Sequence, residues 1–101
     1  MNMQRAGPRN FPADEQRLAE FGERLRLARL RRNFSVELVA KRAGVSRTTL
    51  YKVERGGAAV TLGTYLRVLA VYGLSGDIDL LAADDVLGRR LQDLELAPRR
   101  T

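Results

Sequence analysis

The segment from residue 46 to residue 56 holds the side chains whose types and spacing could bind a ligand. Leu50 and Val53 are three residues apart, so they share one face of a helix. The opposite side then carries one polar and basic stripe, made of Arg47, Thr48, Tyr51, Lys52 and Arg55. Thr and Tyr are poor helix formers, which indicates that binding rather than propensity explains them. Such side chains can donate to phosphates or base edges, and an α-helix fits the major groove of B-DNA.

The distribution of charge favours an anionic partner. Residues 1–57 carry 13 Lys/Arg against 6 Asp/Glu, whereas residues 58–101 carry 5 against 6. A basic half beside a near-neutral half predicts one surface for a polyanion and another for protein or solvent. General use of Arg in place of Lys explains the composition equally well, because 16 of the 18 basic residues are Arg.

The composition argues against catalysis. The sequence has no His and no Cys, so the commonest bases, nucleophiles and soft metal ligands are missing. Asp77, Asp79, Asp84 and Asp85 lack the Gly and Glu spacing of a calcium-binding loop. There is also no glycine loop of the phosphate-binding type. We therefore expect no enzyme activity, no cofactor and no metal site.

Hydropathy predicts a globular protein of the cytoplasm. Apolar residues make up 45% of the chain. No apolar run approaches the roughly 20 residues needed to span a bilayer. The N-terminal segment lacks the apolar stretch of a secretory signal, and the absence of Cys fits a reducing compartment.

Helical periodicity predicts an all-α fold, a compact bundle of about five short helices. The expected helices span residues 14–32, 36–43, 46–55, 62–72 and about 75–83. Three of them start at or just after a hydroxyl residue that can cap the helix, namely Ser35, Ser46 and Thr61. The expected stops are Asn33, Gly44, Gly56 and Gly73. The predicted domain is 14–83, after a flexible basic arm (1–13) and before a tail (84–101).

The apolar spacing also predicts which side chains face the core. In the first helix these are Leu18, Phe21, Leu25 and Ala28, and in the fourth they are Leu62, Tyr65, Leu66, Leu69 and Tyr72. In the second they are Leu38, Val39 and either Arg42 or Ala43. The tail is open to three interpretations: one helical turn, a short strand around Leu94–Leu96, or no ordered structure.

The second helix, the turn and the third helix form a helix-turn-helix pattern. The stretch "LRLARLRRNFSVELVAKRAGVSRTTLYKVERG" resembles the Cro/cI-type (XRE) helix-turn-helix domain, and the resemblance runs from about Phe21 to Asp79. Its most specific parts are Ala40, the turn 43–46, Leu50 and the Glu54-x-Gly56 ending. The resemblance implies a lambda-repressor-like fold and a regulator of transcription that binds double-stranded DNA. It also implies a repressor that acts as a homodimer, with helix 46–55 in the major groove.

The resemblance assigns roles to individual residues. Arg47, Thr48 and Lys52 match positions that read base edges, and Tyr51 lies near the backbone edge of the stripe. Arg55 and the amides around Gly56–Ala59 match a phosphate-contacting loop. The expected DNA-binding residues are Ser35, Ser46, Arg47, Thr48, Tyr51, Lys52, Arg55 and Gly56.

Two further features follow from the resemblance. Arg29 and Glu54 match a structural ion pair of the family. Val36 stands where the family often has a Gln that holds a phosphate and a recognition residue. Contact from the second helix is therefore expected to depend on Ser35 and the positive end of that helix.

The neutral half suggests protein contacts. Leu74, Ile78, Leu80, Leu81 and the tail are the expected dimer surface. The tail "LLAADDVLGRRLQDLELAPRR" also resembles those of small regulators encoded beside Hip-type kinases. The alternative function is therefore an antitoxin that inhibits a toxin partner of that type and represses their shared operon. A module that binds only protein is a third interpretation, which the basic stripe disfavours.

Overall fold

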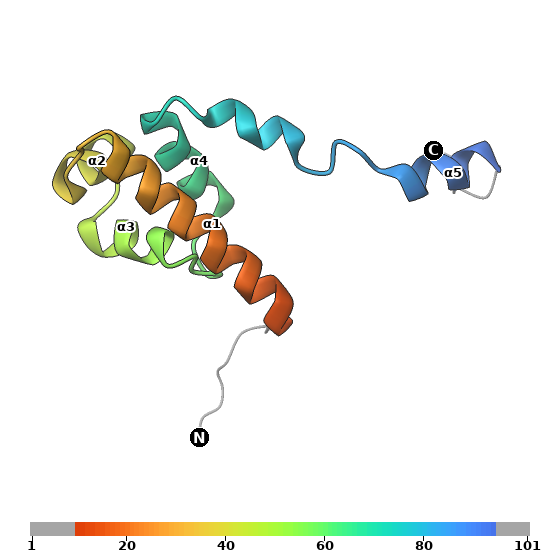
Figure 1. Ribbon diagram of the computed structural model, residues 1–101, viewed down its shortest axis with the longest axis horizontal. Coiled ribbons are helices and arrows are strands. Elements are labelled where there is room, and N and C mark those ends of the chain that lie inside the picture. The colour runs from red at the N-terminus through yellow and green to blue at the C-terminus, as the bar shows by residue number, and fades with distance from the viewer. Residues whose placement is uncertain (1–9, 95–101) are drawn as a thin grey trace, which may run out of the picture.

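Six helical elements follow one another along residues 10–94, the part of the chain that the computed structural model describes (Figure 1). They are α1 (Pro12–Arg31), α2 (Val36–Ala43), α3 (Arg47–Glu54), α4 (Leu62–Val71), the 3-10 helix η2 (Ser75–Leu80) and α5 (Val86–Asp93). This confirms the all-α class. α1 to α4 form the bundle, and α5 stands away from it (Figure 1). No helix within the described residues is long and apolar enough to cross a membrane.

The predicted caps begin three of the bundle helices. Ser35 Oγ accepts a hydrogen bond from the amide of Leu38, at 3.0 Å. Ser46 Oγ and Thr61 Oγ1 do the same for the amides three residues further on, at 3.0 and 3.1 Å. α1 begins at Pro12, two residues earlier than predicted. Proline suits this position, because the first helical amide needs no intrahelical acceptor.

α1 to α4 all end at a residue in the left-handed region. The φ angles are 56° at Asn33, 71° at Gly44, 73° at Gly56 and 74° at Gly73. The amide after each of these residues bonds back to the last helical turn, as Gly57 N does to Lys52 O at 2.8 Å. This pattern satisfies carbonyls that a helix end leaves open. All four predicted stops are confirmed.

The core lies between α1, α2, α3 and α4. Its buried apolar residues are Leu25, Ala28, Val39, Ala40, Ala43, Leu50, Val53, Tyr65, Val68, Leu69 and Tyr72. One predicted core position is wrong. Leu62 is exposed, because the buried side of α4 includes Val68 and does not extend back to the first helical residue. Of the two alternatives on α2, Ala43 is buried in the core and Arg42 is exposed. The guanidinium of Arg42 lies over the ring of Phe34, at 5.4 Å from the centroid.

The chain after α4 differs from the prediction in two ways. The fifth predicted helix is a 3-10 helix that ends at Leu80, because Leu81 is extended and Ala82 has a φ of 57°. The tail then forms α5, two turns rather than one, with Asp85 as its cap. Asp85 Oδ1 accepts from the amide of Gly88 at 2.9 Å. Leu94 follows α5 directly, and the rest of the predicted strand lies outside the described residues.

Candidate nucleic-acid interface

The turn between α2 and α3 fixes the orientation of α3. It consists of Gly44, Val45 and Ser46, of which Val45 packs against the core. The left-handed φ of Gly44 lets the chain reverse here without strain. On α3, Leu50 and Val53 have 0% of their surface exposed. These contacts hold one side of α3 against the bundle and turn the other side to solvent.

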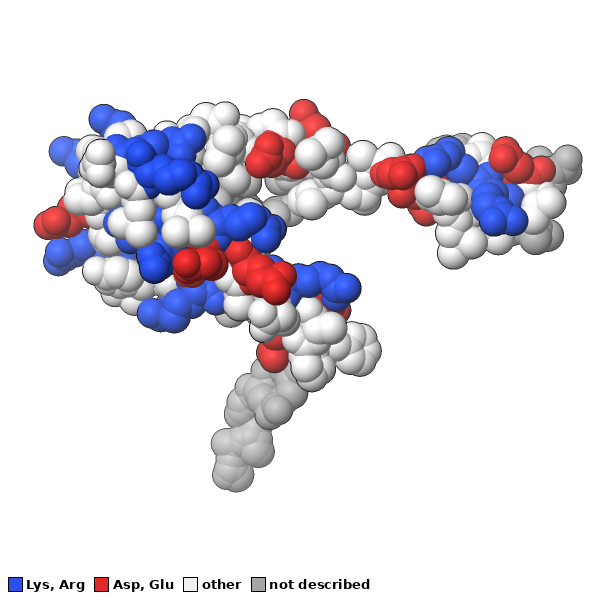
Figure 2. Space-filling model, viewed as in Figure 1, with Lys and Arg blue, Asp and Glu red and all other residues white. Residues whose placement is uncertain are grey.

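The predicted stripe is the solvent side of α3. Arg47, Thr48, Tyr51, Lys52 and Arg55 are all exposed. Basic side chains gather over the bundle, whereas acidic side chains recur over η2 and the segment after it (Figure 2). Within residues 10–94, Lys52 and Arg55 form no ion pair. Their charges are therefore open to an anionic ligand.

The hydroxyl groups at the starts of α2 and α3 are already in use. The Ser46 hydroxyl accepts from the amide of Thr49 and donates to Thr49 Oγ1, at 3.0 and 3.1 Å. The Ser35 hydroxyl accepts from the amide of Leu38. Both residues are exposed, and their hydroxyls fix the starts of α2 and α3.

The loop after α3 presents two open amides. The amides of Gly56 and Gly57 donate to carbonyls of α3, and Gly56 is buried. Tyr65 on α4 donates its hydroxyl to the carbonyl of Gly57, at 2.8 Å, which holds the loop. Among the described residues, the amides of Ala58 and Ala59 have no hydrogen-bond acceptor. A phosphate bound at this loop would thus meet those two amides rather than that of Gly56.

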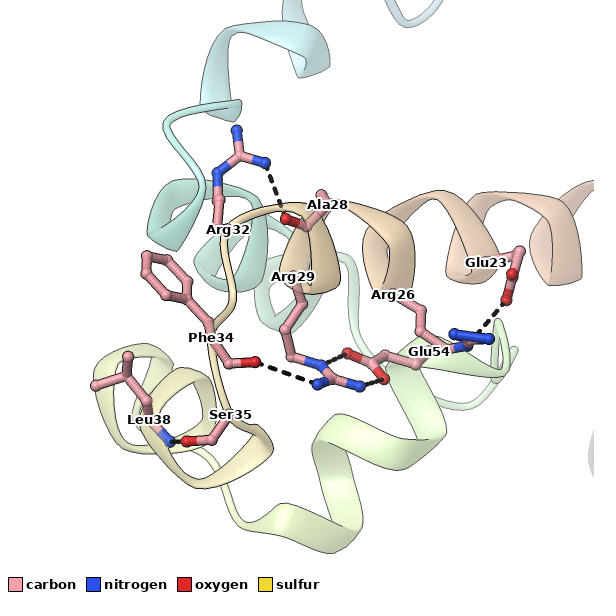
Figure 3. Close-up of polar contacts among 9 residues, drawn as sticks. All are labelled: Glu23, Arg26, Ala28, Arg29, Arg32, Phe34, Ser35, Leu38 and Glu54. Atoms are coloured by element: carbon pink, nitrogen blue, oxygen red, sulfur yellow. Dashed lines mark hydrogen bonds and ion pairs between the residues drawn. The ribbon is translucent and has the colours of Figure 1, made fainter.

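The predicted pair of Arg29 and Glu54 lies between α1 and the C-terminal end of α3 (Figure 3). Arg29 Nε donates to Glu54 Oε2 at 2.7 Å, and Nη2 donates to Oε1 at 3.0 Å. Nη1 reaches the carbonyl of Phe34 at 3.3 Å. The side chains are only 12% and 5% exposed. The hydrogen bond to Glu54 raises the pKa of Arg29 further above its usual value. The pair joins α1, the end of α3 and the loop before α2.

Two residues that position the site were missed from the sequence. Gly22 is buried on α1 where the end of α3 crosses it. A Cβ there would lie 2.6 Å from the carbonyl oxygen of Val53. Arg67 on α4 donates from Nε to the carbonyl of Ala43, at 3.1 Å, and so holds the end of α2. A glycine inside a helical pattern was the available signal for the first, and no local signal marked the second.

Comparison with known proteins agrees with this geometry. The helix-turn-helix domain family matches residues 20–83, a span that contains α2, α3, α4, η2 and most of α1. A comparison with curated proteins gives no match. The family match covers more than half of the 101 residues and includes the turn and stripe described above. The chain therefore belongs to the helix-turn-helix domain family and is a DNA-binding regulator.

Proposed function

We propose that the protein is a cytoplasmic, sequence-specific transcriptional repressor of the XRE (Cro/cI) type. The exposed stripe carries this proposal, because five polar or basic side chains project from α3 and its C-cap Arg55, and two fully buried residues anchor the helix. A helix held in this way can enter the major groove while its buried side chains stay packed in the core. The basic half of the chain supplies attraction to the phosphates.

The stripe divides into two kinds of contact. Arg47, Thr48 and Lys52 read base edges, where Arg and Lys pair with guanine. Tyr51 and Arg55 lie toward the backbone, together with the open amides of the following loop. The start of α2 at Ser35 and the N-cap of α3, Ser46, complete the proposed DNA-binding surface. The loop that begins at Gly56 takes one phosphate.

A homodimer is the proposed active form. One recognition helix covers only a few base pairs, so useful affinity generally needs two half-sites about 34 Å apart. Several leucines beyond the bundle are exposed and support self-association: Leu80, Leu81, Leu87, Leu91 and Leu94. Pairing through these side chains would remove apolar surface from water.

Selection of sites from a randomised duplex pool, at near-physiological salt, tests the proposal. The expected product is an inverted repeat with half-sites about one helical turn apart. Arg47→Ala and Lys52→Ala should each cost about 1–3 kcal/mol on that site and relax base preference. Arg17→Ala, at the start of α1, is the matched control and should leave the preference unchanged. Failure of the folded protein to enrich any sequence would contradict the proposal.

The second candidate is the antitoxin of a Hip-type kinase. The observation in its favour is α5, whose apolar side chains are exposed on an element apart from the bundle. Such a helix can bind a protein partner other than a second copy of this chain. Leu87→Ser with Leu91→Ser should then abolish binding of a kinase encoded beside the gene, while monomeric affinity for a half-site stays unchanged. Retention of kinase binding by this variant would count against the assignment.

A further inference from the structure

One acidic residue interrupts the most basic part of the chain. Residues 24–53 contain a single carboxylate, that of Glu37, among nine Lys and Arg residues. Glu37 is the second residue of α2, two positions after the cap Ser35. A carboxylate at this place repels DNA phosphates, so it weakens general attraction of the surface to DNA.

Glu37 faces the first residue of α3. Its Oε2 lies 3.5 Å from Arg47 Nη1, and the two side chains are 74% and 63% exposed. An ion pair as exposed as this contributes little to folding. The position of Glu37 in the first turn of α2 favours that helix slightly, through the helix dipole. Neither effect accounts for an acid that faces a residue of the stripe.

We propose that Glu37 is a specificity-determining residue that acts on Arg47, an inference that rests on the proposed DNA-binding function. Free Arg47 would bind the nearest phosphate of any sequence. The carboxylate of Glu37 restrains the guanidinium and competes with phosphate for it. A guanidinium has five N–H donors, so Arg47 can hold Glu37 and still donate two bonds to guanine O6 and N7. The cognate complex keeps the ion pair, whereas non-specific binding breaks it.

Glu37→Gln in the full chain tests this inference, because it removes the charge and keeps the shape. Affinities are measured for the selected operator and for an unrelated duplex of equal length. Binding to the unrelated duplex should tighten more than binding to the operator, so the ratio of the two affinities falls about three- to tenfold. In an Arg47→Ala background the same substitution should leave the ratio unchanged.

Two controls separate this role from simpler ones. Asp14→Asn removes the same charge from an exposed pair with Arg17, near the opposite end of α1 from α2. It should change both affinities equally. Glu37→Asp keeps the charge but draws the carboxylate back, so it should restore part of the ratio.

Three results would overturn the inference. An equal gain on both duplexes would reduce Glu37 to a general charge effect. A lower unfolding midpoint with an unchanged ratio would leave only the helix-dipole role. Absence of any preference by the unaltered protein would overturn the proposed function, and this inference with it.

Discussion

At the scale of single residues, the pair of Arg29 and Glu54 makes the sharpest prediction about stability. Removal of either partner leaves the other charge buried without compensation. Arg29→Ala should therefore lower the free energy of unfolding by about 3–5 kcal/mol. Urea titration measures this as a lower midpoint with an unchanged slope. Arg17→Ala breaks an exposed pair and should cost about 1 kcal/mol or less. Equal losses in the two variants would refute a structural role for the buried pair.

Tyr72 makes a prediction about pH. Its buried hydroxyl has no hydrogen-bond partner among the described residues, and burial raises its pKa to about 12. The folded protein thus favours the neutral phenol. The resulting contribution to the free energy of unfolding is complete below the ordinary pKa of about 10. It is lost as the pH rises through about 12.

Tyr72→Phe removes both the unpaired hydroxyl and its titration. The variant should match or exceed the natural protein in stability at neutral pH. Its free energy of unfolding should decline less between about pH 9 and about pH 12. Some decline remains, because burial raises the pKa of Tyr65 as well. Urea titrations across this range measure the difference, and parallel declines in the two proteins would contradict the assignment.

At the scale of the elements, the crossing of α1 and α3 depends on Gly22. A methyl group there would meet the carbonyl oxygens of Val53 and Glu54, at 2.6 and 2.8 Å. Gly22→Ala should therefore destabilise the protein by about 1–3 kcal/mol, despite the better helix propensity of alanine. Thermal or urea unfolding measures the loss.

Gly63 in α4 is the matched control. A Cβ at Gly63 would find its nearest neighbour, Thr61 Oγ1, at 3.9 Å. Gly63→Ala should then stabilise the protein by up to about 1 kcal/mol, as propensity predicts. A stabilising effect at both positions would mean that α3 does not rest on α1 as closely as described.

Local signals made most of the bundle predictable. Ser35, Ser46 and Thr61 mark helix starts, and each of the four stops is a residue type suited to positive φ. The rest depends on contacts between elements. The face of α4 that becomes buried is chosen by packing, so spacing alone misplaced Leu62. The tail follows weak signals, and a single Asp cap was too little to predict α5.

At the scale of the whole molecule, the bundle and α5 should be separable. No residue of α5 is buried. Deletion of residues 86–101 should therefore leave the unfolding midpoint of the bundle nearly unchanged. It should also reduce self-association, as sedimentation measures. Deletion of residues 74–101 is the control, because Leu74 packs against the core. Unfolding after the shorter deletion would refute the separation.

The candidate site was also predictable only in part, because some of its contacts join different elements. The stripe on α3 follows from helix geometry and two apolar residues, so its exposed side chains were named correctly. Its neighbours come from other elements. Glu37 approaches Arg47 across the turn. The amide of Gly56 donates to a carbonyl of α3, and this depends on the exact residue at which that helix ends. Contacts of this kind appear only when the elements are placed in space.

The segment between η2 and α5 has a bearing on operator architecture. It comprises residues 81–85, which reach at most about 17 Å when extended. In a dimer joined through α5, two such tethers separate the bundles. The distance between the two recognition helices is then not set by a rigid interface. Such a dimer should accept inverted repeats whose spacers differ by a base pair, and a shorter tether should narrow that tolerance.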